Sequence, residues 1–277
     1  MLPADQQAVL DGWLPGAVVV ADHSWSLGLR YVLELEHDGE CYALKAGGAD
    51  DGHMAREINA HDRWLEPWTS RGFAPQRVAS DRELRMLLTR WLPGALVEGT
   101  PAASDPDTFR QAGVLLRLLH DQSGVVDHDY ERRETDKSLT WLAKPHRIAP
   151  DVEARLRVAI DTWDTELSAD LVPTHGDWQP RNWLVDRGAI SAIDFGRADL
   201  RPAATDLARL AAQDFRRDPS LERAFLEGYG TDLRSPAAWR RMLVREAIST
   251  AVWAYQVGDE PFEQQGHRMI AEALAER

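Results

Sequence analysis

Two short segments in the second half of the sequence carry three oxygen-bearing side chains at a spacing that suits phosphoryl transfer. Asp177 and Asn182 belong to the segment His-Gly-Asp-Trp-Gln-Pro-Arg-Asn, and Asp194 begins an Asp-Phe-Gly segment 17 positions after Asp177. The apolar run 189–194 predicts a strand that would bring the two segments together. Carboxylate and amide oxygens suit Mg²⁺, and the transfer needs a metal ion and a carboxylate that holds the attacking hydroxyl. We therefore expect Asp177 to be the catalytic base, and Asn182 and Asp194 to hold the metal.

These two segments also resemble a known group of enzymes. The pattern His-Gly-Asp-x-x-x-x-Asn, followed by Ile-Asp-Phe-Gly-Arg, resembles the aminoglycoside phosphotransferase and choline kinase superfamily. The resemblance implies an α+β, bilobal protein-kinase-like fold, with a small β-rich N-terminal lobe and a larger helical C-terminal lobe. It also implies that ATP, or another nucleoside triphosphate, donates its γ-phosphate to a hydroxyl of a small molecule with Mg²⁺ as cofactor. If Asp177 only formed a turn and Asp194 only capped a loop, their joint spacing would stay unexplained.

The resemblance implies nucleotide-binding residues in the first half of the chain. Residues 42–45, Tyr-Ala-Leu-Lys, resemble the strand whose lysine grips the phosphates, which is Lys45 here. Strand alternation puts Ala43 on the same face as Lys45, where its small side chain would roof the adenine. Glu57, in the next predicted helix, would be the acidic partner of Lys45. Without the downstream segments, Lys45 would be interpreted as a solvent-facing strand end and Glu57 as a surface helix residue.

Further contacts are implied in the segment between the lobes and in an early loop. The main-chain carbonyl of Arg90 and the main-chain amide of Leu92 would bond to the edge of the adenine. Ser26, in the loop 22–28, would contact the phosphates, although this loop departs from the protein-kinase pattern because it holds one glycine. Arg201 is a second departure, since relatives often carry an acid immediately before the proline that follows it. This departure makes the local loop packing and the substrate contacts less predictable.

The first hundred residues favour strands. An Asp-Gly pair between the alternating runs 31–36 and 40–46 predicts a β-hairpin. Asp50 and Asp51 predict the start of a helix that continues to about residue 64. Another strand is expected over 85–89, before the breaker Pro-Gly.

After that breaker the pattern becomes helical. Ser-Asp-Pro-Asp at 104–107 predicts a helix start, and an apolar stripe continues it to about His120. The sequence predicts further helices over 151–168, 203–215, 219–228, 236–256 and 260–276. We therefore expect an N-terminal nucleotide-binding lobe over residues 1–91 and a C-terminal catalytic and substrate-binding lobe over 92–277.

Composition and charge exclude several classes of partner. The net charge of −13 argues against a nucleic-acid partner, because such proteins usually present a basic face. No apolar stretch approaches the roughly 20 residues that span a bilayer, and the first residues lack the pattern of a secretion signal. The single cysteine, Cys41, cannot form an internal disulfide and is typical of the cytoplasm. An acidic surface would also attract a cationic acceptor, although ordinary solubilising charge is the simpler interpretation.

The acceptor stays open between several classes. Acidic charge and the family resemblance favour an aminoglycoside or a related antibiotic, which would make the protein a resistance enzyme. The alternative is a metabolite kinase for a sugar, amino sugar, amino alcohol or natural-product intermediate, because specificity lies outside the shared scaffold. A second alternative is a pseudokinase module that binds nucleotide without turnover. Trp178 and Trp183 flank the predicted catalytic loop, where either could line a sugar or amine site or simply pack in the core.

Overall fold

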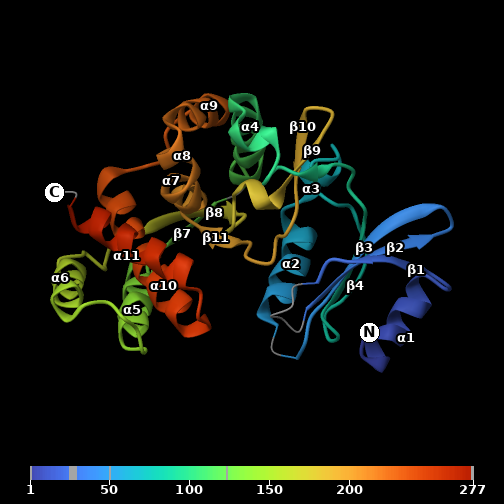
Figure 1. The fold of residues 1–277 in the computed structure, drawn as a ribbon, viewed down its shortest axis with the longest axis horizontal. Helices are drawn as coiled ribbons and strands as arrows, with labels where there is room; N and C mark the ends of the chain where they lie inside the picture. The colour runs from blue at the N-terminus through green and yellow to red at the C-terminus, as the bar shows by residue number, and fades with distance from the viewer. Residues whose placement is uncertain (1, 25–29, 50, 123, 276–277) are drawn as a thin grey trace. The chain divides into compact units, whose positions relative to one another are not determined.

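A computed structural model of the chain describes residues 2–24, 30–49, 51–122 and 124–275 (Figure 1). The chain forms two compact units that alternate along the sequence. Unit 1 comprises Met1–Gln122, Pro173–Asp199 and Asp218–Thr231, and unit 2 comprises Ser123–Val172, Leu200–Arg217 and Asp232–Arg277. The lobe boundary predicted at residue 91 stays a prediction.

Unit 1 begins with a five-stranded antiparallel sheet of strand order β1-β2-β3-β5-β4. Its strands are β1 (Val18–Asp22), β2 (Tyr31–His37), β3 (Glu40–Ala46), β4 (Arg77–Asp81) and β5 (Met86–Arg90). The predicted hairpin is confirmed, because Asp38 and Gly39 join β2 to β3 with φ angles of 51° and 76°. Positive φ at both central residues is typical of a type I′ turn, whose twist matches that of the strands it joins.

The two faces of this sheet have different neighbours. Side chains of β3 alternate between buried and partly exposed, as the two-residue period of a strand requires, and Ala43 and Lys45 are on the partly exposed face. The buried face packs against helix α1 (Ala4–Trp13), which contributes Leu10 to the apolar core, with Leu14 just after the helix. The face that carries Lys45 is therefore left for a ligand or for another element.

Helix α2 (Gly52–Arg63) packs on the Lys45 side of the sheet. Met54 and Ile58 of this helix contact Leu87, which pairs directly with Lys45 across the sheet. Asp51 caps the helix, as predicted, by accepting a 2.8 Å hydrogen bond from the backbone N–H two residues later. This packing brings the side chains of α2 within reach of Lys45.

The rest of unit 1 consists of short strands and three helices. They are α3 (Glu66–Thr69), β6 (Ala95–Leu96), α4 (Pro106–His120), β9 (Trp183–Asp186), β10 (Ala189–Ala192) and α9 (Pro219–Tyr229). Strands β10, β9 and β6 form a second antiparallel sheet in that order. Asp105 caps α4 as predicted, accepting a 2.9 Å hydrogen bond from the backbone of Asp107. The predicted apolar stripe of α4 is fully buried.

Unit 2 is mainly helical and has its own core. Its elements are β7 (Val125–Asp127), α5 (Tyr130–Leu142), α6 (Pro150–Asp161), β8 (Ala169–Thr174), β11 (Asp199–Arg201), α7 (Ala208–Ala212), α8 (Asp214–Arg217), α10 (Pro236–Val257) and α11 (Glu260–Ala275). The three strands form a sheet of order β11-β8-β7. The core is formed by apolar side chains of α5, α6, α10 and α11. Together the two units confirm the predicted α+β class.

Several predicted helices differ from those observed. The helix predicted over 151–168 ends at Asp161, because the next two backbone N–H groups bond three residues back, to Ala159 and Ile160, and so tighten the last turn. The region 203–215 is a 3₁₀ turn followed by the short helices α7 and α8, with a break at Gln213. Helices α1 and α5 were not predicted, whereas α9, α10 and α11 agree with the prediction within one to two residues.

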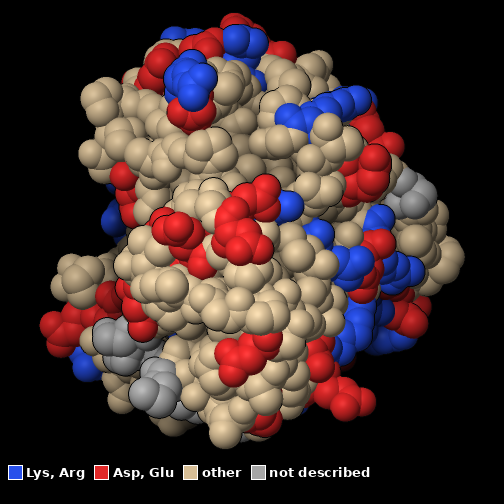
Figure 2. Space-filling view, turned by 90° about the vertical axis from the view of Figure 1, so that its right-hand side faces the viewer, with Lys and Arg blue, Asp and Glu red and all other residues tan. Residues whose placement is uncertain are grey.

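None of the helices in the described part of the chain is both long enough and apolar enough to cross a membrane. Figure 2 shows acidic and basic side chains side by side on one face of the molecule. The net charge of −13 therefore does not make this face uniformly acidic.

Two glycines let helices α4 and α9 approach at backbone distance. A Cβ atom on Gly228 would overlap the backbone of Arg110, and one on Gly113 would overlap the carbonyl of Phe225. We predict that Gly228→Ala lowers the free energy of unfolding by about 1–3 kcal/mol, because the helices must separate to admit the methyl group. Urea denaturation followed by tryptophan fluorescence measures this change.

The control for this prediction is Gly12→Ala in α1, where no atom lies within 4 Å of the added Cβ. That change should be neutral or stabilising by up to about 1 kcal/mol, since alanine favours the helix. Equal effects of the two substitutions would contradict the close-packing argument.

Candidate active site

Lys45 lies between two carboxylates that come from distant parts of unit 1. Its Nζ atom donates to Oε1 of Glu57 at 2.7 Å and to Oδ1 of Asp194 at 3.3 Å. Glu57 is in α2 and Asp194 follows β10. The ammonium group of Lys45 therefore bonds β3 to α2 and to the Asp-Phe-Gly segment. The lysine and the glutamate side chains are 18% and 4% exposed, whereas that of Asp194 is 41% exposed. Asp194 is therefore the member of the trio that faces solvent.

The charges of the three groups depend on one another. Burial alone would lower the pKa of Lys45, but the neighbouring carboxylates of Asp194 and Glu57 raise it above its ordinary value. The ammonium of Lys45 in turn holds the pKa of Asp194 well below its usual range, against the effect of burial. Burial raises the pKa of Glu57, and the ion pair with Lys45 opposes that rise. Lys45 and Asp194 are thus charged at neutral pH.

The loop after β8 is shaped by a histidine and a glycine. Gly176 adopts a φ of 77°, in the left-handed region that favours glycine. The backbone N–H of Asp177 donates to Nδ1 of His175 at 3.3 Å, so Nδ1 carries no proton and Nε2 carries it. Nε2 of His175 then donates to the carbonyl of Ile193 at 3.1 Å. His175 therefore fastens the Asp177 loop to the strand that ends at Asp194.

A second backbone link joins the same two segments. The N–H of Ile193 donates to the carbonyl of Asn182 at 3.0 Å. Asp194, the next residue, has a φ of 66°, a conformation that aspartate adopts more readily than most residues. The structure thus brings Asp177, Asn182 and Asp194 into one neighbourhood, and Lys45 and Glu57 join them through Asp194.

The carboxylate of Asp177 is held by three donors from its own loop. Gln179 Nε2 donates to Oδ1 at 2.5 Å, Arg181 Nη2 to Oδ2 at 2.7 Å, and Asn182 Nδ2 to Oδ2 at 3.1 Å. Asn182 Nδ2 also donates to the backbone carbonyl of Asp177 at 2.8 Å. Asp177 is buried, whereas the Arg181 side chain is 37% exposed. A positive charge therefore lies directly beside the predicted base, on the side open to solvent.

The donor set at this site fits a magnesium ion. The amide nitrogen of Asn182 is engaged with Asp177, and its Oδ1 accepts no hydrogen bond from any residue that the structure describes. Asp194 stays ionised beside Lys45, as a ligating carboxylate must. One amide oxygen and one carboxylate are the kind of partial ligand set that Mg²⁺ completes with water and phosphate oxygens.

Aromatic side chains pack beneath the loop that carries Asp177. Trp178 contacts Trp68, His175 and Trp183 at ring-centroid distances of 5.6, 5.2 and 5.2 Å. Phe195 of the Asp-Phe-Gly segment lies 4.9 Å from His175 in the same cluster. Trp178 and Trp183 are almost fully buried. They pack in the core, so the suggestion that one of them lines a sugar or amine site is wrong for the structure as it stands.

Two of the predicted nucleotide-contacting residues, Ala43 and Arg90, belong to inner strands of the first sheet. Ala43 shares the face of Lys45, and Arg90 ends β5. The N–H of Trp91 donates to the carbonyl of Cys41 at 3.0 Å, whereas the N–H of Leu92 donates to no group in the described residues. Ser26 lies outside the residues that the structure describes. The contacts assigned to these four residues stay predictions.

Three residues near the site were not predicted from the sequence. Gln179 and Arg181 bond to the carboxylate of Asp177, and Arg56 Nε donates to the carbonyl of Gly196 at 3.0 Å. Arg56 precedes Glu57 on α2, so the helix holds the Asp-Phe-Gly segment with two successive side chains. The position of Arg181 four residues after Asp177 was the available signal, since a short helical turn brings such pairs together.

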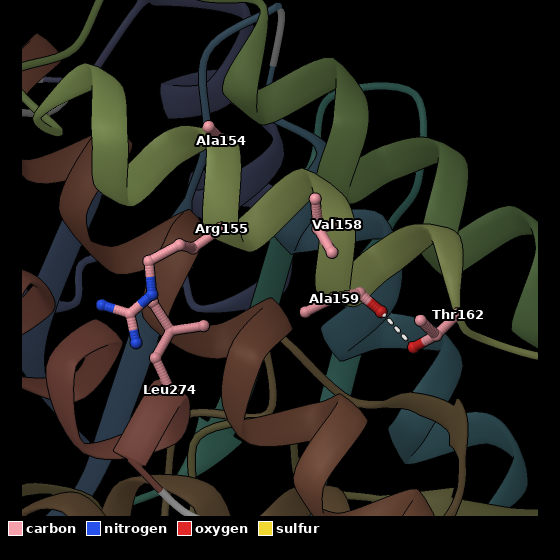
Figure 3. Close-up of a pocket in the computed structure, with 6 residues that line it drawn as sticks. All are labelled: Ala154, Arg155, Val158, Ala159, Thr162 and Leu274. Atoms are coloured by element: carbon pink, nitrogen blue, oxygen red, sulfur yellow. Dashed lines mark hydrogen bonds between the residues drawn. The ribbon is translucent and has the colours of Figure 1, made fainter.

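A hollow of about 400 Å³ lies elsewhere, in unit 2 (Figure 3). It is lined by residues of α6 and its end together with one residue near the end of α11: Ala154, Arg155, Val158, Ala159, Thr162 and Leu274. The Thr162 hydroxyl donates to the carbonyl of Ala159, so this polar group is already satisfied. Arg155 is the one charged group of the lining, and none of the predicted catalytic residues contributes to it. The hollow is shallow, and its lining residues include no pair of groups that could act as acid, base or nucleophile.

Comparison with known proteins identifies the family. Residues 7–243 match the phosphotransferase enzyme family, so the chain belongs to that family. The protein is accordingly a small-molecule kinase, which transfers phosphate to a hydroxyl group. The superfamily suggested by the sequence segments is thus confirmed. No curated protein matches the sequence.

Solved structures with the same fold include kinases for different acceptors. Choline kinase LicA from Streptococcus pneumoniae has a TM-score of 0.72 and 14% identity, covering 99% of this chain and 100% of that one. Aminoglycoside phosphotransferase APH(4)-Ia has a TM-score of 0.69 and 13% identity, covering 98% and 97%. A choline/ethanolamine kinase family protein from Mesorhizobium loti has a TM-score of 0.60 and 19% identity, covering 97% and 91%. These matches confirm the predicted α+β, kinase-like fold.

The contacts of Lys45 predict a coupled effect on stability. Lys45→Met leaves Glu57 buried without its cation, and removing one partner of such a pair costs about 3–5 kcal/mol of unfolding free energy. The double variant Lys45→Met/Glu57→Gln should recover part of that loss, because the buried side chain at position 57 no longer carries an unpaired charge. Urea denaturation of the wild type, both single variants and the double variant measures the coupling.

Lys137→Met provides the matched control, because Lys137 pairs with Glu134 at 3.4 Å on the surface. Its loss should cost less than about 1 kcal/mol. If Lys45→Met were as mild as Lys137→Met, or if the double variant were no more stable than Lys45→Met, the bridging role of Lys45 would be refuted.

Proposed function

We propose that the protein uses ATP and Mg²⁺ to phosphorylate a hydroxyl of a small molecule, with Asp177 as the base. The observation that carries this proposal is the double contact of Lys45 with Glu57 and Asp194, at 2.7 and 3.3 Å. It brings a cation for phosphates next to an ionised carboxylate suited to a metal. Structures of APH(4)-Ia in ternary complexes with hygromycin B and ADP or AMP-PNP show that this fold accommodates a nucleotide and a second small molecule together.

Each residue has a defined part in the proposed reaction. Lys45, held by Glu57, binds phosphate oxygens of the nucleotide. Asn182 and Asp194 would hold Mg²⁺, which when bound neutralises charge on the phosphates. Asp177 accepts a hydrogen bond from the acceptor hydroxyl and takes its proton as the oxygen bonds to the γ-phosphorus. The bond from that phosphorus to the β-phosphate oxygen breaks, ADP leaves, and Asp177 returns the proton to water.

The decisive substitution is Asp177→Asn. It keeps the size of the side chain but removes the base, and we predict a fall in turnover of about 10²–10⁴-fold with little change in ATP affinity. A coupled assay for ADP release measures turnover across aminoglycosides, other hydroxyl-bearing antibiotics, amino sugars and amino alcohols. Asp186→Asn, on the neighbouring strand β9, is the matched control and should retain full activity.

The outcomes separate the proposal from its alternatives. Near-wild-type turnover in Asp177→Asn would refute Asp177 as the base. ATP binding by the wild type without any acceptor-dependent turnover would favour the pseudokinase module over the kinase. Acceptor-dependent turnover that disappears in the variant supports the kinase and names the acceptor class.

The position of Arg181 bears on which acceptor is used. An aminoglycoside or related antibiotic is the acceptor that the sequence favours, and a metabolite is the alternative. The Arg181 guanidinium lies 2.7 Å from the carboxylate that would hold the acceptor hydroxyl. Two like charges about 4 Å apart repel by about 1 kcal/mol in water and about 4 kcal/mol near a protein surface. Arg181 therefore offsets the attraction that the Asp177 carboxylate would exert on an ammonium group of the acceptor, which supports a neutral or acidic metabolite acceptor.

We predict that Arg181→Gln changes this charge preference. For the acceptor found in the panel, kcat/KM is compared between an amine-bearing form and its N-acetylated form, which lacks the charge. The wild type should prefer the uncharged form, and Arg181→Gln should reduce that preference about 5–10-fold, since about 1 kcal/mol of repulsion is removed. Arg187→Gln, at the exposed turn after β9, is the control and should leave the preference unchanged. An unchanged preference in Arg181→Gln would mean that this arginine does not select the acceptor.

A further inference from the structure

A cluster of two arginines and one glutamate lies in unit 2, whereas every residue assigned to the reaction belongs to unit 1. Arg241 Nε and Arg245 Nη2 both donate to Oε2 of Glu131, at 2.9 and 2.8 Å. The two arginines are four residues apart on α10, which places them on one face of that helix. Glu131 is in the first turn of α5. The two helices therefore meet at this cluster of charges.

The charges of the cluster do not balance. Two guanidinium groups share a single carboxylate oxygen, which leaves one net positive charge. The side chains are largely removed from water, since Arg241, Arg245 and Glu131 are 13%, 12% and 7% exposed. An uncompensated buried charge is costly, so such groups are normally paired. This excess of positive charge occurs in a protein whose net charge is −13.

Donor groups of both arginines have no acceptor in the described residues. Arg241 uses Nε on Glu131, and its two terminal nitrogens donate to no described group. The Nε of Arg245 is buried and has no hydrogen-bond partner. Its Nη2 also donates to the Thr135 hydroxyl at 3.2 Å. The ring of Trp163 lies 5.0 Å from Cζ of Arg245, a cation–π contact that does not cancel the charge.

A tyrosine and a third arginine are close to the cluster. Tyr130 precedes Glu131, and burial and the nearby carboxylate of Glu134 raise the pKa of its hydroxyl above the ordinary value, whereas Arg245 and Arg201 act on it in the opposite direction. The phenol therefore stays protonated and can donate a hydrogen bond. Arg201 is the residue that departs from the family pattern, where relatives often carry an acid. The surroundings of the cluster thus add one phenol donor and one further guanidinium, together with the carboxylate of Glu134.

We propose that Arg241 and Arg245 form a binding site for a small oxyanion, a carboxylate or a phosphate group. The planar guanidinium of Arg241 presents two unoccupied nitrogens in a fork, which suits two oxygens of one such group. Glu131 accepts hydrogen bonds from both guanidinium groups and so fixes their orientation. The one positive charge that it does not neutralise is available to pair with the ligand. None of its residues is assigned to the phosphoryl transfer, so the site goes beyond the proposed kinase reaction.

Inorganic phosphate is the probe for this site. Isothermal titration of the full chain, with ADP and Mg²⁺ present to occupy the nucleotide site, measures its dissociation constant. Arg241→Gln should weaken phosphate binding about tenfold or more, because a charge-assisted hydrogen-bonded pair is lost. Arg240→Gln is the matched control, since the adjacent side chain is exposed and the substitution removes the same charge. Asp177→Asn should bind phosphate as the wild type does, which separates this proposal from that of the kinase reaction.

A variant of opposite sign guards against simple loss of folding. Glu131→Gln removes the competing carboxylate, so phosphate should bind more tightly than in the wild type, whereas a purely structural triad would only lose stability. Circular dichroism checks that each variant is folded, and Arg241→Lys, which keeps the charge but not the fork, replaces Arg241→Gln if the latter is unfolded. No binding by the wild type at millimolar phosphate would overturn the proposal. So would equal affinity of Arg241→Gln and Arg240→Gln, or no tightening in Glu131→Gln.

Inhibition kinetics distinguish which molecule supplies the oxyanion. If phosphate inhibits turnover competitively against the acceptor, the site holds an acidic group of the acceptor itself. If phosphate binds without competing with the acceptor, the site holds a free oxyanion. Both results support the site, and they differ only in which molecule supplies the ligand.

Discussion

The ammonium group of Lys45 is the contact on which the rest of unit 1 depends. It balances a carboxylate from α2 and another from the Asp-Phe-Gly segment, and both of them are drawn toward the sheet face that α1 leaves uncovered. Because Asp194 is adjacent to Ile193, the same contact reaches the Asp177 loop through the backbone groups of Ile193, which bond to the carbonyl of Asn182 and to the imidazole of His175. Apolar packing sets the positions of the strand, the helix and the Asp-Phe-Gly segment. The buried charge of Lys45 in addition requires the carboxylates of α2 and of that segment to lie next to β3.

The sequence could predict the parts of the site whose spacing is local. Asp177 and Asn182 are separated by one short turn, and Asp194 follows one hairpin later, so their proximity depends on few intervening residues. Asp51 and Asp105 were predictable for the same reason, because a cap bonds to the backbone only two residues away. The positions of Lys45 and Glu57 needed the family resemblance, since no local rule brings a strand and a helix side chain together.

What could not be predicted depends on neighbours that are distant in the chain. Helix α1 has a weak apolar stripe, and its place is set by the sheet face it covers. Helix α5 has one buried charged residue in its first turn, Glu131, and its partners are two arginines of α10. The burial of Trp178 and Trp183 is decided by Trp68 and Phe109, which belong to other elements. The pairing of Arg181 with Asp177, by contrast, depends only on the local turn and is predictable from the four-residue spacing.

The alternation of the two units along the chain has a consequence for synthesis. Helix α4 lies against α9 at backbone distance through Gly113 and Gly228, and in the sequence all of the helices α5 to α8 lie between the two. A nascent chain that has emerged only as far as α4 therefore leaves an apolar helix face uncovered until α9 follows. Contacts between such distant segments close slowly, because a long loop must be ordered first. During translation unit 1 therefore cannot complete its packing until most of unit 2 has been synthesised. The helix face of α4 that stays exposed meanwhile is the surface on which a chaperone would act.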